Sequence, residues 1–234
     1  MSGWQDRWSL PAVIVFALVA VPMAVLLLPK PEVISSAPPP WEMRSDSAGN
    51  PQILGITLDI SRLNEVEQLF IRPAEVNLFV TEALPATEAT ERLLLEAYFA
   101  SVNVAGLQAR VVLVLNADER ELQAIYQRGA RVSATAPGRR KVQLADADRR
   151  AVGDLTIASL TYMPSADISE DLLRQRFGEP AEILDEGASG NRHWLYPERG
   201  LSIVVNDDAK EVFQFLSPLR FTTWRDRLAA ELKI

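Results

Sequence analysis

The amino-terminal part of the chain carries its longest run of apolar positions. Residues 10–28 contain neither a charged side chain nor a strong hydrogen-bonding one. As a helix with about 1.5 Å of rise per residue, this run would be roughly 28 Å long, which matches the hydrocarbon core of a bilayer. Trp8 precedes the run and Lys30 follows it, as is typical of residues at a membrane interface. The pattern predicts a transmembrane helix over residues 10–28, preceded by a tail of residues 1–9.

Two other interpretations of this run are weaker. A cleaved signal peptide usually has a shorter apolar core. Its best cleavage position, residues 35–37, is followed by Pro38, which obstructs cleavage. A buried core helix would show a polar face, and this run has none. We therefore expect an uncleaved single-pass anchor, although the flanking charges of Arg7, Lys30 and Arg44 are too evenly divided to give its orientation.

The segment after the apolar run, residues 29–51, is rich in proline, serine and small polar residues. Such a composition buries too little apolar surface to fold alone, so we expect a partly extended tether. A loop packed on the rest of the chain is the alternative, and only around Trp41 and Met43.

Two pairs of similar segments recur in the same order farther along the chain. Residues 59–76 and 167–183 both begin with Asp-Ile-Ser and end with Phe-x-x-Pro-Ala-Glu and a β-branched residue. Residues 111–125 and 201–215 align without a gap and share an Asn-x-Asp sequence. Two matches in one order indicate an internal duplication.

Each copy has the pattern of a helix between strands. The Asp-Ile-Ser can cap a helix start, and apolar residues then recur at helical spacing as far as Phe70 in the first copy and Phe177 in the second. Gly178 and Pro180 end the second helix. Ile71 stands at the glycine position in the first copy, so we expect that helix to end differently.

Strands are predicted after the second helix, where apolar and polar positions alternate. Trp194 and Tyr196 fall on one face of such a strand, and His193 and Leu195 fall on the other. In the first copy, residues 111–115 are apolar at every position, which predicts burial on both faces where the copies pack together.

The expected fold class is therefore α+β, with an N-terminal transmembrane helix followed by two tandem repeats of helices packed on a short antiparallel sheet. The first repeat covers residues 52–126 and the second covers residues 155–217, with residues 127–154 as a connector. Residues 218–234 form a C-terminal amphipathic helix with Trp224 on its apolar side. That helix either packs on the domain or docks on a partner, and the pattern leaves both open.

The motifs of the second repeat are similar to those of a known family. They are Ser169, Phe177-Gly178-x-Pro180, Trp194-x-Tyr196, Gly200-Leu201 and Asn206-Asp207-Asp208. This order resembles the SmpA/OmlA (BamE-like) domain of lipoproteins of the outer-membrane β-barrel assembly machinery. The fold of that domain, a helix pair on a short antiparallel sheet, also occurs in a tandem β-lactamase-inhibitor protein. The resemblance covers about residues 155–217, and the first repeat, residues 52–126, shows it more weakly.

The chain departs from the family in three ways: it lacks the lipoprotein cysteine, it has an apolar helix instead, and it repeats the unit. Membership in the assembly machinery therefore does not carry over. The resemblance does imply a cell-envelope location and a protein-binding function. With the apolar helix, it leads us to expect an inner-membrane, single-pass protein with residues 1–9 in the cytoplasm and the C-terminal domain in the periplasm.

Composition and charge argue against several kinds of binding and catalytic site. The formal net charge of −7 disfavours nucleic-acid binding. The chain has no cysteine, which removes disulfides, thiolate catalysis and zinc–cysteine sites. The single histidine, His193, has no nucleophile elbow of the G-x-S-x-G kind to work with. The acidic turn at residues 206–208 lacks the spacing and glycine of an EF-hand loop. The basic residues at 139–141 and 149–150 suit a solvated loop, with anionic lipid headgroups as the alternative.

The sequence therefore assigns no catalytic, cofactor-binding or metal-binding residue and suggests no small-molecule substrate. We expect a membrane-anchored, non-catalytic protein-binding or scaffold module of the bacterial cell envelope, with an unidentified envelope protein as partner and the membrane bound through residues 10–28. Candidate partner-binding residues are Trp194, Tyr196 and Trp224. The alternatives are an inhibitor of, or accessory subunit to, an envelope enzyme complex, or a carboxylate-based hydrolase. No Asp/Glu pair stands out in the sequence to support the hydrolase.

Overall fold

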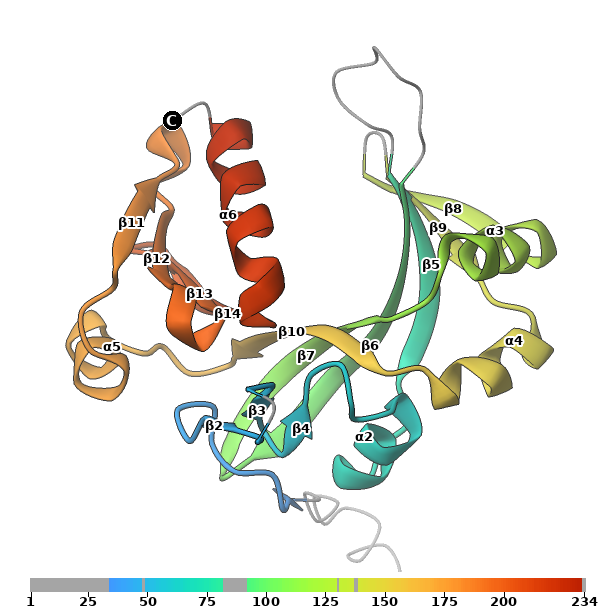
Figure 1. The fold of residues 1–234 in the computed structure, drawn as a ribbon, viewed down its shortest axis with the longest axis horizontal. Helices are drawn as coiled ribbons and strands as arrows, with labels where there is room; N and C mark the ends of the chain where they lie inside the picture. The colour runs from blue at the N-terminus through green and yellow to red at the C-terminus, as the bar shows by residue number, and fades with distance from the viewer. Residues whose placement is uncertain (1–33, 48, 82–91, 130, 137–138, 233–234) are drawn as a thin grey trace, which may run out of the picture. The chain divides into compact units, whose positions relative to one another are not determined.

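One sheet of eleven strands dominates the computed structural model, which describes residues 34–47, 49–81, 92–129, 131–136 and 139–232 (Figure 1). Its path runs in the order β11, β12, β13, β14, β10, β7, β6, β5, β9, β8, with neighbours antiparallel, and β1 pairs with β6 in parallel. The strands are β1 (Ile34–Ser35), β5 (Glu75–Thr81), β6 (Arg92–Val104), β7 (Leu107–Leu115), β8 (Arg131–Ala136), β9 (Arg139–Gln143), β10 (Ile157–Pro164), β11 (Glu182–Asp185), β12 (Arg192–Tyr196), β13 (Leu201–Asn206) and β14 (Ala209–Leu216).

The remaining described elements are a small second sheet and the helices. A second sheet contains β2 (Arg44–Ser45), β3 (Pro51–Ile53) and β4 (Ile56–Thr57). The α-helices are α2 (Leu63–Leu69), α3 (Glu119–Arg128), α4 (Asp146–Ala151), α5 (Glu170–Phe177) and α6 (Pro218–Leu232), and the 3-10 helices are η1 (Val152–Asp154), η2 (Gly187–Ser189) and η3 (Pro197–Arg199).

The expected fold class is wrong, because the two halves do not form separate small sheets. β7 of the first half pairs with β10, and β10 pairs on its other edge with β14, so the strands of both halves join one continuous sheet. Backbone N–H and C=O groups at a strand edge need partners, and here each half supplies those of the other. The structure is mostly β, rather than helices packed on two short sheets.

The two faces of this sheet carry different cores. On the outer face, as we name the face that bears Trp194 and Phe213, side chains from α2, α3, η1 and α5 pack into the main core. On the inner face, which bears Leu195 and Leu216, α6 packs through Phe221 and forms a second, smaller core. The alternation predicted along β12 is confirmed by this division. Figure 1 shows α6 on one side of the β11–β14 region, separated from the other helices.

The first pair of similar segments has similar local structure in both copies. Phe70 follows α2 and Phe177 ends α5, both are buried, and in each copy the chain then passes through Pro-Ala-Glu into a strand. The N–H of Ile71 donates to the carbonyl of Gln68 and that of Arg72 to the carbonyl of Glu67, which is a Schellman ending. The backbone at Ile71 has φ +52°, so it takes a positive φ as Gly178 does, at +81°. The two helices nevertheless end differently, as expected, because Gly178 has ψ −172°, outside the left-handed helical region, and its N–H donates to the carbonyl of Arg174.

The second pair of similar segments has different structures. Residues 111–125 contain the end of β7, a loop and α3, whereas residues 201–215 contain the hairpin of β13 and β14. Asn116 precedes the helix cap Asp118, while Asn206 precedes a tight turn. The Asn-x-Asp sequence suits both a helix cap and a turn, so this match does not identify equivalent positions.

The segment expected to be a tether is packed where the structure describes it. β1 pairs with β6, Ala37 is buried, and Trp41 and Met43 pack against the main core. The Ser35 hydroxyl donates a hydrogen bond of 3.1 Å to the carbonyl of Leu69. The packed-loop alternative therefore extends over more of residues 34–51 than the two residues considered for it.

The expected transmembrane, single-pass, inner-membrane localisation is corrected on one finding. Within the ranges that the structure describes, no helix is both long enough and apolar enough to cross a membrane. Residues 10–28, on which the expectation rested, lie outside the described residues.

Candidate interaction site on the inner face of the sheet

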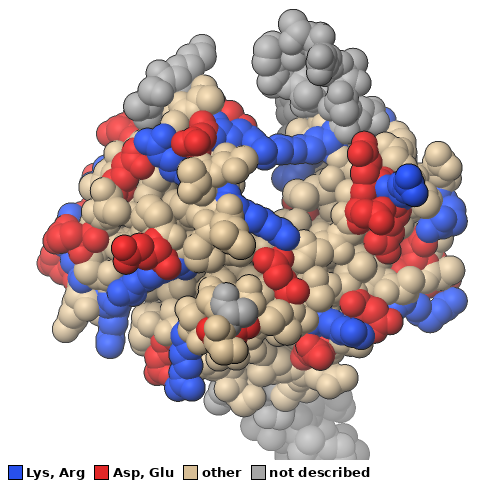
Figure 2. Space-filling view, viewed as in Figure 1, with Lys and Arg blue, Asp and Glu red and all other residues tan. Residues whose placement is uncertain are grey.

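Half of the inner face carries no described helix. α6 packs over the β11–β14 part, whereas no described helix or strand covers the part made by β9, β5, β6, β7 and β10. Figure 2 shows the surface hollowed near its centre, with basic side chains along the upper rim of the hollow. We call this uncovered part the open inner face.

Apolar side chains form the middle of the open inner face. Phe79 lies opposite Leu94 in the β5–β6 register, Tyr98 lies opposite Val112 in the β6–β7 register, and Val114 shares the face of Val112. All five are half-buried. The expected burial of residues 111–115 on both faces is thus correct for the outer face and only partial for the inner one.

An ion pair lies beside these apolar residues. A guanidinium nitrogen of Arg139 on β9 donates to the Glu96 carboxylate of β6 at 2.8 Å, and the guanidinium carbon lies 4.2 Å from the centre of the Phe79 ring. The Glu96 side chain is only 15% exposed. Burial raises the pKa of the Glu96 carboxyl, because removing water disfavours its charged form more than Arg139 favours it.

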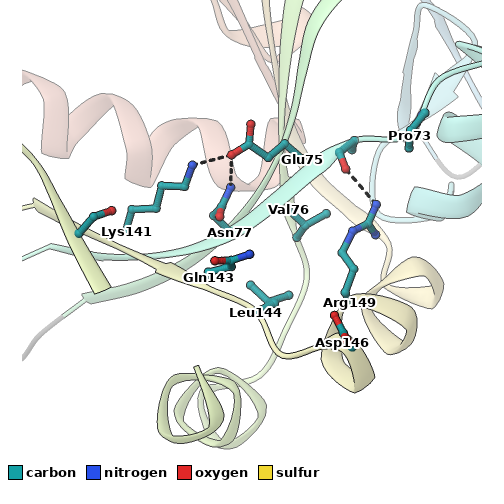
Figure 3. A pocket seen from close by; sticks show the side chains of 11 residues that line it. Pro73, Glu75, Val76, Asn77, Lys141, Gln143, Leu144, Asp146 and Arg149 are labelled. Atoms are coloured by element: carbon teal, nitrogen blue, oxygen red, sulfur yellow. Dashed lines mark hydrogen bonds and ion pairs between the residues drawn. The ribbon is translucent and has the colours of Figure 1, made fainter. Parts of the chain in front are cut away.

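At the end of the open inner face, β5 and β9 separate after the Asn77–Gln143 pair and leave a cavity of about 680 Å³ (Figure 3). The cavity is lined by Pro73, Ala74, Glu75, Val76, Asn77, Ser133, Lys141, Gln143, Leu144, Asp146 and Arg149. Its lining combines residues of the inner face with Val76 and Leu144 from the edge of the main core.

Polar contacts hold both walls of this cavity. Lys141 Nζ and Asn77 Nδ2 both donate to Glu75 Oε1, at 2.5 and 3.1 Å. These hydrogen bonds, that from Lys141 above all, lower the pKa of Glu75. On the other wall, one guanidinium nitrogen of Arg149 donates at 2.9 Å to Glu67 and at 2.9 Å to the carbonyl of Ala74. Two glutamates therefore neutralise the two cations that line the cavity.

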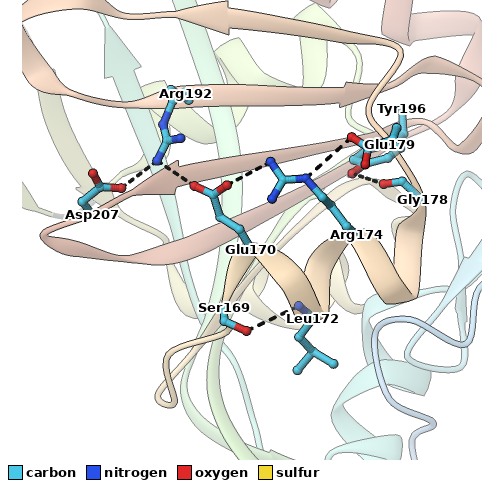
Figure 4. A network of polar contacts seen from close by, with 9 residues as sticks. All are labelled: Ser169, Glu170, Leu172, Arg174, Gly178, Glu179, Arg192, Tyr196 and Asp207. Atoms are coloured by element: carbon cyan, nitrogen blue, oxygen red, sulfur yellow. Dashed lines mark hydrogen bonds and ion pairs between the residues drawn. The ribbon is translucent and has the colours of Figure 1, made fainter.

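The three residues proposed from sequence for partner binding lie elsewhere. Trp194 is 1% exposed on the outer face, with the Arg174 guanidinium 4.6 Å above its ring. The Tyr196 hydroxyl donates to the carbonyl of Gly178 at 3.0 Å (Figure 4). Trp224 belongs to α6 and is partly buried beside Phe221 of the same helix. All three stabilise the fold, and none belongs to the open inner face.

The surroundings of Trp194 form a polar network at the surface. Glu170 pairs with Arg174 at 3.0 Å and with Arg192 at 2.8 Å, and Arg192 also reaches Asp207 at 2.7 Å (Figure 4). The network connects α5 with β12 and with the turn between β13 and β14. The acidic turn noted in the sequence therefore contributes one of its carboxylates to an ion pair, and the described residues contain no cluster suited to a metal ion.

His193 faces the inner side of β12 near the second core. Its Nε2 atom lies 3.9 Å from the Glu186 carboxylate, and burial lowers the pKa of the imidazole.

The basic residues noted in the sequence separate into two roles. Arg139 and Lys141 belong to β9 and pair on the inner face, whereas Arg149 belongs to α4 and lines the cavity. Glu75 and Glu96 were not among the site residues expected from the sequence. The signal available was a period of two along residues 75–81, where polar and aromatic residues alternate with Val, Leu and Val.

Comparisons with known proteins assign no family to the chain. No family model matches the chain, and no curated protein does. Among solved structures, a DUF4309 family protein (YjgB) from Bacillus subtilis is similar at 12% sequence identity and a TM-score of 0.36, over 72% of this chain and 88% of that chain.

Proposed function

We propose that the chain is a non-catalytic protein-binding module and that its partner binds on the open inner face. The observation that carries the proposal is the group of half-buried apolar residues there, which includes Phe79, Tyr98 and Val112, beside the Glu96–Arg139 ion pair. Apolar surface removed from water contributes about 25 cal/mol per Å². Aromatic residues and arginine also carry much of the binding energy at protein interfaces.

The other half of the same face supports the proposal. There, Leu195 and Leu216 are covered by α6, whose Phe221 is 1% exposed. The sheet thus accepts an amphipathic helix on one half of its inner face, and a partner segment would occupy the other half in a similar way. The resemblance of residues 155–217 to the SmpA/OmlA domain favours protein binding as well. A partner that is an enzyme would make the chain an inhibitor or an accessory subunit.

Site-specific photocrosslinking tests the proposal. A photoreactive amino acid at Val112 on the open inner face should yield a discrete adduct with another protein in cells that make the full-length chain. The same amino acid at Asp171, which is exposed on α5 over the outer face, is the matched control and should yield none. Adducts from both positions alike, or from neither, would contradict binding at the inner face.

One observation favours a carboxylate-based hydrolase as a second candidate. Glu75 lies opposite Tyr98 and Glu96 lies opposite Asn77, so the two glutamates are diagonal neighbours on one face. Residues at diagonal positions are about 7–8 Å apart along the sheet, so two glutamate side chains there can reach one substrate, as the paired carboxyl groups of a glycosidase must. The pKa of Glu96 is raised and that of Glu75 is lowered, as an acid and a base would require.

Turnover measurements separate the two candidates. The full-length chain would be assayed on a panel of chromogenic glycosides and esters, beside Glu96→Gln. A rate that the wild type shows and Glu96→Gln loses would establish the hydrolase. A rate that survives in Glu96→Gln, or no turnover at all, would exclude this pair as its catalyst.

A further inference from the structure

We propose that the segment bound on the open inner face is acidic: a protein segment whose apolar residues cover Val112 and its neighbours and whose Asp or Glu side chains pair with Arg92 and Arg110. This inference rests on the proposed function and adds the chemistry of the partner. The whole chain carries a net charge of −7, so a basic face differs in sign from the rest of the molecule and points to an acidic partner there.

The strand registers place four cations on the open inner face. Arg110 lies opposite Met163 and shares the face of Val112, while Arg92 lies opposite Thr81 and shares the face of Leu94. Arg139 and Lys141 add two more from β9. The carboxylates that these open strands place on the same face are those of Glu75 and Glu96, so the cations outnumber them.

The pairing of these groups shows which charges are available. Arg139 is bound to Glu96 and Lys141 is bound to Glu75, so both pairs are close to neutral. Arg92 and Arg110 are exposed, and neither forms an ion pair or side-chain hydrogen bond with a described residue. The open inner face therefore offers two guanidinium groups with free donors, which carboxylates match in charge and in geometry.

The apolar residues between these charges favour a protein over other anionic partners. A nucleic acid would need many unpaired cations along its phosphates, and two of the four here are already neutralised. A bilayer would need its contact residues to be exposed, whereas Val112 and Tyr98 are half-buried. A segment with alternating acidic and apolar residues fits both the central apolar residues and the outlying arginines.

Peptide selection on the immobilised full-length chain tests the inference. Random peptides displayed on phage should become enriched in Asp and Glu beside aliphatic or aromatic residues. A selected peptide, measured by fluorescence anisotropy, should bind at least tenfold more weakly to Arg110→Glu, and the affinity should fall as salt rises. Arg150→Gln, at an exposed arginine of α4 outside the sheet, is the control and should bind as the wild type does.

A charge exchange protects the test from a variant that folds poorly. A peptide in which the critical Glu is replaced by Lys should lose binding to the wild type and regain it with Arg110→Glu, which a misfolded variant could not do.

The failures of the two proposals are distinguishable. Selected peptides that are not acidic, yet lose binding in Val112→Asp, would overturn this inference and leave the proposed function standing. Peptides that bind Val112→Asp and Arg110→Glu as well as the wild type would overturn both. Binding of single-stranded DNA, or of vesicles with anionic headgroups, in preference to every selected peptide would overturn the assignment of a protein partner.

Discussion

The guanidinium group of Arg220 lies 2.9 Å from the carboxylate of Asp59, joining α6 to the loop before α2. Asn116 supports the pair, since its Nδ2 atom donates to Asp59 at 3.0 Å and to the Thr156 hydroxyl at 2.9 Å. Asp59 itself has φ +64°, a left-handed conformation that aspartate tolerates better than most residues do. This group of residues ties the inner-face helix to the first half of the chain.

Removing the Arg220 side chain should therefore loosen α6 slightly. Because the Arg220 and Asp59 side chains are 49% and 27% exposed, water screens their attraction, and Arg220→Ala should lower the free energy of unfolding by only about 0.5–1 kcal/mol. Urea denaturation measures the change. Arg227→Ala, at an exposed position of the same helix, is the control and should leave stability unchanged; an equal loss there would assign the effect to the helix rather than to the ion pair.

Phe70 and Phe177 should be equally hard to replace. Phe70 packs edge-to-face on Phe99, with the two ring centres 5.0 Å apart. The ring centre of Phe177 lies 6.1 Å from that of Tyr196 and 5.9 Å from that of Phe213. Substituting alanine at either leaves a cavity and should cost roughly 3–5 kcal/mol, measured by chemical denaturation. Leu219→Ala, at a side chain 93% exposed, should cost almost nothing. A cost below about 1 kcal/mol at either phenylalanine would show that its site collapses or is not packed as described.

Replacing Ile71 by glycine should stabilise the protein. Ile71 is β-branched, has φ +52° and is 63% exposed, so it is strained there and buries little in return. Relief of this strain in Ile71→Gly should raise the free energy of unfolding by about 1 kcal/mol. The greater flexibility of glycine in the unfolded chain offsets part of that gain. Gly178→Ala makes the opposite change at the matching position, where an added Cβ meets no atom within 4 Å, and strain alone should make it destabilising. Thermal melts of both variants would decide, and a lower Tm for Ile71→Gly would refute the strain.

The charge of Glu96 should make stability fall as pH rises. Because the pKa of Glu96 is higher in the folded chain than in the unfolded one, the folded chain binds its proton more tightly. Its contribution is therefore greatest below the unfolded pKa and declines as pH rises through the folded pKa. The difference in unfolding free energy between wild type and Glu96→Gln should shift against the wild type from about pH 4 to about pH 7.

Two further variants check that assignment. Arg139→Gln should enlarge the pH effect, because it removes the cation that partly offsets burial. Glu119→Gln, at an exposed glutamate of α3, should track the wild type throughout this pH range. A difference between wild type and Glu96→Gln that does not change with pH would show that the carboxyl is not perturbed.

Local features of this chain were predictable because they depend on neighbouring residues. The two faces of β12 and the buried Phe70 and Phe177 follow from periods of two and of 3.6 in the sequence. The positive φ at Ile71 was not predictable, because isoleucine disfavours that conformation and only the hydrogen bonds that close α2 impose it.

The open inner face could not be derived from sequence for a different reason. Glu75 and Glu96 look like ordinary surface acids until β5 pairs with β6 and β9, which bring in Arg139 and Lys141 from far along the chain. The period of two along residues 75–81 gives the face on which Glu75 lies, but it does not show which strands pair beside it. The β7–β10 pairing could not be predicted for the same reason. The sequence therefore suggested two short sheets, whereas the structure has one long sheet.

The position of β10 between β7 and β14 has a consequence for folding. Both edges of β10 are paired, one with a strand about fifty residues earlier in the chain and the other with a strand about fifty residues later. Such distant contacts give a high contact order, which is typical of slow folding in milliseconds to seconds. Until β10 is in place, β7 and β14 each keep an unpaired edge that can pair with another molecule. The chain should therefore fold in a single cooperative step, and a fragment that ends before β10 should aggregate.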